Sequence, residues 1–139
     1  MAETRAEAPQ LVSVPVVRDP RGALAVIDCA FADFNIQRVY FLYDVDSNSA
    51  RGSHAHRELR QLIIAASGSF RVSLDDGSGN YSEFEMRDPQ TALVVPPGHW
   101  RRIYDFSHGS VCLVLASEQY NEADYIRDYD EFLSWKRSQ

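Results

Sequence analysis

A chain of 139 residues is most simply one domain with a single hydrophobic core, and we expect residues 1–139 to form such a unit. A net charge of −6 argues against a general nucleic-acid or membrane-surface role. No apolar run approaches the ~20 residues of a membrane helix, and the N-terminal "MAETRAEAPQ" lacks the apolar core of a signal peptide. We therefore expect a cytoplasmic protein with a flexible tail over about residues 1–10.

Short β-prone segments with turn signals between them fill the chain from residue 11 to residue 117. The expected strands cover residues 11–17, 23–28, 38–45, 61–66, 69–76, 81–86, 91–96, 100–106 and 110–117. Many short strands at close spacing indicate an all-β sandwich or barrel. The clearest hairpin turn is "DDGSGN", because glycine and asparagine tolerate positive φ.

Only the C-terminal segment, about residues 121–137, has a helical pattern. Apolar and aromatic residues stand near helical spacing at Tyr125, Tyr129, Phe132, Leu133 and Trp135. The segment is also acidic, so we expect short helical turns on the outside of the barrel, with a solvated face and an apolar underside.

The pair His54 and His56 is the first candidate for chemistry. Side chains in a strand alternate between faces, so both imidazoles would project the same way, with Cα atoms about 6.6 Å apart. Such a pair could hold a metal ion or move protons, and the spacing of the pair alone leaves both open.

The residues around this pair resemble the cupins, a family of small double-stranded β-helix (jelly-roll) proteins. The frame is His54-x-His56, four residues, Gln61, six residues and Gly68, and metal-binding cupins have a glutamate ligand where Gln61 stands. In "PPGHWRRIYD", Arg101 stands where the second cupin motif has its third histidine ligand. The resemblance covers about residues 20–116 and implies an all-β jelly roll.

The departures from the cupin pattern disfavour a metal. A catalytic metal site usually needs three histidine, carboxylate or thiolate ligands. Here the two histidines remain, but an amide and a guanidinium stand at the other two cupin ligand positions, and the fixed positive charge of Arg101 would repel a cation. We expect no cofactor and no metal, and proton transfer by the two imidazoles, which titrate near pH 6.5 when unperturbed.

The strings "RGSHAHRELRQLIIAASGSF", "VPPGHWRRIYDFSHGSVCLVLASEQY" and "DYIRDYDEF" closely resemble the dTDP-4-oxo-6-deoxyglucose 3,4-ketoisomerases, from about residue 19 to residue 132. The resemblance implies metal-free conversion of dTDP-4-keto-6-deoxyglucose into a dTDP-3-keto-6-deoxyhexose through an enediolate. His54 and His56 match the family's histidine pair, with their individual roles left open. The residues expected to bind substrate are Arg38, Tyr40, Tyr43, Arg51, Gln61 and Arg101; alternation puts Arg38 and Tyr40 on one face of their strand and Tyr43 on the other.

The same resemblance implies partners. A PLP-dependent aminotransferase would use the product to make a 3-amino-3,6-dideoxysugar for a surface glycan such as lipopolysaccharide or an S-layer. These cupins generally form homodimers that exchange or pack N-terminal strands, and the open edges of a jelly roll favour such pairing.

Three alternatives remain. A dTDP-sugar 3,5-epimerase also enolises its substrate, but that family lacks the His-Ala-His string. A non-catalytic sugar-nucleotide-binding cupin would have the same fold and binding residues. A metal-dependent cupin oxygenase would require a bound metal for turnover.

Overall fold

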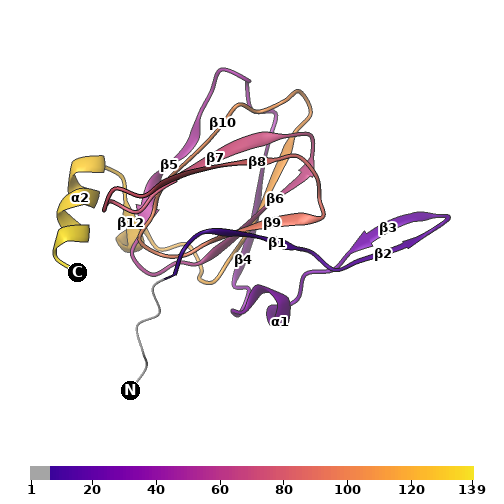
Figure 1. The fold of residues 1–139 in the computed structure, drawn as a ribbon, viewed down its shortest axis with the longest axis horizontal. Coiled ribbons are helices and arrows are strands. Elements are labelled where there is room, and N and C mark those ends of the chain that lie inside the picture. The colour runs from indigo at the N-terminus through magenta and orange to yellow at the C-terminus, as the bar shows by residue number, and fades with distance from the viewer. Residues whose placement is uncertain (1–6) are drawn as a thin grey trace.

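The computed structural model describes residues 7–139, and its core is a sandwich of two antiparallel five-stranded sheets (Figure 1). The first sheet contains, in spatial order, β1 (Gln10–Ser13), β9 (Thr91–Val95), β6 (Gln61–Ser67), β11 (Val111–Ala116) and β4 (Arg38–Tyr43). The second contains β12 (Tyr125–Ile126), β5 (Arg51–His56), β10 (Trp100–Tyr104), β7 (Phe70–Asp75) and β8 (Tyr81–Met86). The expected all-β jelly roll is confirmed.

The sheets enclose the main hydrophobic core because alternate residues of each strand face inward. On β6, Ile63 and Ala65 join this core, whereas Leu62 and Ile64 belong to a second cluster with residues of α1 and the chain next to it. Gly68 follows β6 at φ +66, and a Cβ there would lie 2.8 Å from the Cα of Ser110. The last position of the histidine–glutamine–glycine frame therefore requires glycine for a tight turn.

The N-terminal part differs from the expected single strand over residues 11–17. Pro15 lacks a backbone donor, and the chain divides there into β1 and β2 (Val16–Asp19), which pairs with β3 (Gly22–Ala25). This hairpin extends away from the sandwich at the end opposite α2 (Figure 1). Of the expected tail, residues 1–6 lie outside the described residues, while Glu7 already pairs with Arg60 at 2.6 Å.

The helices also depart from expectation. A short helix that the sequence did not reveal, α1 (Cys29–Ala32), begins at Asp28, whose side chain accepts a hydrogen bond from the Phe31 amide at 2.9 Å. The C-terminal segment is only partly helical, with η1 (Glu122–Asp124), then β12, and then α2 (Tyr129–Arg137). Placing Tyr125 on a helix was wrong, because it lies in β12 opposite His56.

The helix α2 covers the outer surface of the sheet that contains β5. Fully buried Phe132 packs with Ala55 and Ile126, and Trp100 and Trp135 pack around them. Among the described residues, no helix is long and apolar enough to span a membrane.

Candidate active site

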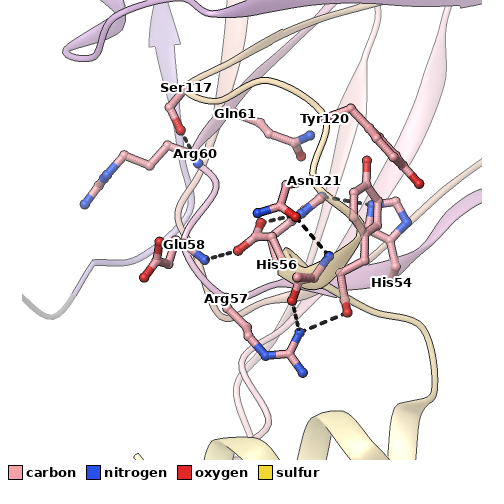
Figure 2. Close-up of polar contacts among 12 residues, drawn as sticks. His54, His56, Arg57, Glu58, Arg60, Gln61, Ser117, Tyr120 and Asn121 are labelled. Atoms are coloured by element: carbon pink, nitrogen blue, oxygen red, sulfur yellow. Dashed lines mark hydrogen bonds and ion pairs between the residues drawn. The ribbon is translucent and has the colours of Figure 1, made fainter.

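The strand β5 brings the two histidines together, as the alternation of side chains predicts. Ala55 points outward to the cluster under α2, while His54 and His56 point inward and are both buried. Their Nε2 atoms lie 3.1 Å apart, and their rings meet edge to face with centroids separated by 4.7 Å (Figure 2). The two imidazoles are therefore in direct hydrogen-bonding contact.

A carboxylate from the C-terminal segment, which the sequence pattern predicts to be solvated, contacts the second histidine of this pair. Asp124, in η1, is buried, and its Oδ2 lies 3.0 Å from Nδ1 of His56. Its Oδ1 accepts a hydrogen bond from the backbone amide of Glu58 at 2.8 Å. The guanidinium of Arg57 donates to the carbonyl oxygens of Ala123 and Tyr125, at 2.9 and 3.0 Å, and so holds this turn against the end of β5 (Figure 2).

A second polar group connects the two sheets beside the histidines. Arg101, on β10, stands opposite His54 in the sheet and donates to Oε1 of Gln61 at 2.7 Å. The Tyr40 hydroxyl accepts hydrogen bonds from Gln61 at 3.0 Å and from Arg101 at 3.1 Å. Three predicted site residues thus form one network, in which Gln61 orients its neighbours.

Burial keeps both histidines neutral near neutral pH. Desolvation, and then the nearby Arg101 charge, lower the pKa of His54 to about 2. The same two causes lower the pKa of His56 to about 4, but the hydrogen bond and negative charge of Asp124 oppose them. His56 is therefore the more basic member of the pair.

Neutral rings can satisfy the His54–His56 and His56–Asp124 contacts together in one way. An ionised Asp124 only accepts hydrogen bonds, so neutral His56 carries its proton on Nδ1 and leaves a lone pair on Nε2. His54 must then carry a proton on Nε2 to donate to that lone pair. Arg101 also has only donors, so its 3.4 Å approach to His54 Nε2 is a close contact and not a hydrogen bond.

His54 forms part of the wall of a cavity of about 470 Å³. The other lining residues are Arg38, Tyr40, Leu42, Arg51, Arg101, Tyr120, Tyr125 and Arg127. Four arginines make this cavity strongly cationic although the chain has a net charge of −6. The cavity is thus suited to an anionic ligand.

Arg51 reaches this cavity through an irregularity in the sheet. An odd spacing from His54 would normally put the two side chains on opposite faces of β5. The pairing of β5 with β10 shifts register between Arg101–His54 and Ile103–Arg51, as in a β-bulge. This shift allows Arg51 and His54 to line the same cavity.

The prediction that Tyr43 lies in the site is not supported by its position. On β4, Arg38, Tyr40 and Leu42 face the cavity, whereas Tyr43 lies on the outer face and is 60% exposed. Its ring is next to Phe41, with centroids 5.8 Å apart. The alternation of β4 gives the reason, since residues 40 and 43 have opposite parity.

The sequence pattern did not indicate Asp124, Tyr125, Tyr120 or Arg127 as site residues. Arg127 bonds twice to Glu122, at 2.7 and 2.9 Å, which raises the pKa of its guanidinium. The guanidinium of Arg38 lies 5.2 and 5.8 Å from the ring centroids of Tyr40 and Tyr120. All four missed residues fall in the string "EQYNEADYIRDYDEF", whose aromatic and charged composition is typical of any exposed segment and does not single out site residues.

Metal-binding groups do not gather at this site. Across residues 7–139, no cluster of three or more histidine, cysteine, aspartate or glutamate side chains has an arrangement that could hold a metal ion. His99 is turned away, with Nδ1 3.0 Å from the carbonyl oxygen of Pro97. Gln61 and Arg101 occupy the other two cupin ligand positions, and the Arg101 guanidinium would repel a cation.

Comparison with known proteins identifies the family. The family model "FdtA: WxcM-like, C-terminal" matches residues 7–137. The TDP-4-oxo-6-deoxy-α-D-glucose-3,4-oxoisomerase of Aneurinibacillus thermoaerophilus is 40% identical over 124 residues, which is 88% of either chain. The chain belongs to the sugar 3,4-ketoisomerase family.

Solved structures of this family have the same fold. The TDP-quinovose 3,4-ketoisomerase WlaRB of Campylobacter jejuni has a TM-score of 0.86 and 40% identity, covering 91% of this chain and 97% of its own. A mutant of the 3,4-ketoisomerase QdtA of Thermoanaerobacterium thermosaccharolyticum, in complex with TDP-4-keto-6-deoxyglucose, has a TM-score of 0.90 and 35% identity, covering 94% and 95%. The resemblance to the 3,4-ketoisomerases that the sequence predicted is therefore confirmed.

Proposed function

We propose that this ketoisomerase converts dTDP-4-keto-6-deoxyglucose into a dTDP-3-keto-6-deoxyhexose. The observation that carries the proposal is a neutral histidine pair, backed by Asp124, on the wall of an arginine-rich cavity. Relatives that act on TDP-sugars at 35–40% identity support the substrate class.

The cavity offers separate groups for the two parts of such a substrate. Guanidinium groups pair with diphosphate oxygens as charged hydrogen-bond donors, and Arg38 and Arg51 are available on the cavity wall, whereas Arg127 already pairs with Glu122. The rings of Tyr120 and Tyr125 supply apolar surface for the sugar or the base. In this arrangement the 4-ketosugar lies against His54, with the diphosphate among the arginines.

The proposed reaction transfers one proton between carbons and one between oxygens. The histidine pair takes the proton from C3, and the electrons of that bond form a 3,4-enediolate. A proton passes from the C3 hydroxyl oxygen to the C4 oxygen, and a proton returned to C4 leaves the ketone at C3. His56 is the more basic member of the pair, while His54 and the Tyr40 hydroxyl stand at the cavity wall, where the oxygens would lie.

Proton NMR of dTDP-4-keto-6-deoxyglucose incubated with the protein in D₂O tests this proposal. We expect the keto group to move from C4 to C3, with solvent deuterium entering at C3 or C4. A non-catalytic binding protein would give neither signal, and a 3,5-epimerase would exchange C5 while the ketone stayed at C4. Either of these results contradicts the proposed activity.

A 3-ketosugar product suits a PLP-dependent aminotransferase as the next enzyme, which would yield a 3-amino-3,6-dideoxysugar for a surface glycan. Adding such an aminotransferase with an amino donor should convert the 3-ketosugar into the aminosugar nucleotide, and absence of the aminosugar would exclude this order of the two enzymes.

We also propose a cytoplasmic location. Recovery of the native protein with the membrane or the exported fraction would contradict it.

We further propose a homodimer in which the N-terminal hairpin packs on or exchanges with the partner. Hairpin β2–β3 extends from the sandwich with Val17 and Leu24 each more than 60% exposed, and Phe41 on β4 is 57% exposed. Exposed apolar surface on strands favours association with a second copy. Light scattering should give a mass about twice that of the chain, and Val17→Asp with Leu24→Asp should reduce it to the monomer; a monomeric wild type contradicts the dimer.

A further inference from the structure

We propose that Asp124 is a positioning residue that fixes the tautomer of His56, so that Nε2 of His56 is the proton acceptor of the site. The inference rests on the proposed ketoisomerase activity only for its kinetic consequence. The geometry on which it depends lies in the contacts of the carboxylate itself.

Each oxygen of Asp124 faces one nitrogen atom at hydrogen-bond distance. Oδ1 accepts from the Glu58 backbone amide at 2.8 Å, and Oδ2 faces Nδ1 of His56 at 3.0 Å. The carboxylate is 8% exposed, so water cannot readily replace either partner. The Glu58 amide is always a donor, whereas His56 Nδ1 can donate or accept, so only the histidine contact depends on the chemistry of residue 124.

The surroundings of Asp124 are held independently of its side chain. The Arg57 amide donates to the carbonyl oxygen of Asp124 at 3.0 Å, and the Asp124 amide donates to that of Asn121 at 3.0 Å. The Arg57 side chain holds the two residues that flank Asp124. An isosteric change of the carboxyl group should therefore leave the turn in place.

Replacing Asp124 by asparagine should reverse the tautomer. The single side-chain oxygen would accept from the Glu58 amide, because an amide NH₂ group cannot do so. The NH₂ group would then face Nδ1 of His56 and donate to it, which requires the His56 proton to move to Nε2. The lone pair needed for proton acceptance would then point at residue 124 instead of toward Nε2 of His54, the histidine that lines the cavity.

The protonation of His56 depends on more than Asp124. The groups that face it are His54 on the same strand, Tyr125 on β12, Arg101 on β10, Arg38 on β4 and Asp124 in η1. Of these, only Asp124 carries a negative charge. Its loss removes the influence that raises the His56 pKa, so the midpoint of the titration should move to lower pH in Asp124→Asn.

Asp128→Asn is the matched control. It makes the same change four residues later, at the N-cap of α2, where the side chain accepts from the Glu131 amide at 3.0 Å. Asparagine caps helices as well as aspartate does, so this variant should fold and turn over normally.

The experiment combines ¹⁵N NMR of labelled histidine with kinetics. The chain has four histidines, and His54→Asn and His56→Asn assign the relevant signals. In the wild type we expect the His56 proton on Nδ1, and in Asp124→Asn on Nε2. The value of kcat should fall about 10²–10⁴-fold in Asp124→Asn, with TDP affinity within about twofold of wild type.

Three results would overturn the proposal: a wild-type His56 with its proton on Nε2, an unchanged tautomer in Asp124→Asn, or a kcat of that variant within about threefold of the wild type. If the wild type does not turn over the ketosugar, the proposed activity fails instead. The tautomer measurement needs no substrate and still decides the role of Asp124.

Discussion

The His54→Asn and His56→Asn variants are each expected to lower kcat by about 10²–10⁴-fold. Asparagine keeps a polar side chain of similar reach but cannot accept and release a proton near neutral pH. His56→Asn removes the most basic nitrogen of the pair, and His54→Asn removes the member that lines the cavity. NMR quantification of the 3-keto product in quenched reactions measures kcat of both variants.

Ligand binding should change little in the same variants. The cavity arginines most suited to a diphosphate are not hydrogen-bonded to His56, and TDP itself lacks the sugar that faces the histidines. TDP affinity by calorimetry should therefore stay within about threefold of wild type. His108→Asn, which changes an exposed histidine outside the site, is the matched control. Near-normal turnover by both His54→Asn and His56→Asn would remove the proton-transfer role from the pair.

The Phe132→Ala variant is expected to lose about 3–5 kcal/mol of unfolding free energy. Phe132 is fully buried between α2 and the sheet, and it packs against Ala55 and Ile126. Truncation removes the aromatic ring and leaves a cavity. Alanine favours helix, so the loss would come from packing and not from the backbone of α2. Urea unfolding followed by circular dichroism measures the change.

The same substitution should lower activity, because its cavity lies directly behind the active site. Ala55 separates the two histidines on β5, and Ile126 follows Tyr125 of the cavity wall. Ser134→Ala, on the exposed face of the same helix, should change the unfolding free energy by no more than about 0.5 kcal/mol. A loss below about 1 kcal/mol for Phe132→Ala would show that α2 does not stabilise this sheet.

The sequence by itself indicated most of the strands and determined the shared face of the histidines. Alternation between faces is a property of two or three neighbouring residues, so it holds wherever the strand lies. It placed His54 with His56 and Arg38 with Tyr40, and it already set Tyr43 apart from them. The hairpin at "DDGSGN" was equally local, because it depends on positive φ at glycine.

The partners of these side chains were decided by the tertiary structure. Asp124 reaches His56 across 68 positions of sequence, because β12 pairs with the end of β5, and nothing in an acidic segment shows which of its carboxylates will be buried. The register shift that turns Arg51 toward the cavity, and the Gln61–Tyr40–Arg101 network across the two sheets, likewise depend on which strands lie side by side. Local periodicity determines the direction of a side chain, whereas its neighbours follow from long-range strand pairing, which a single sequence does not encode in any short stretch.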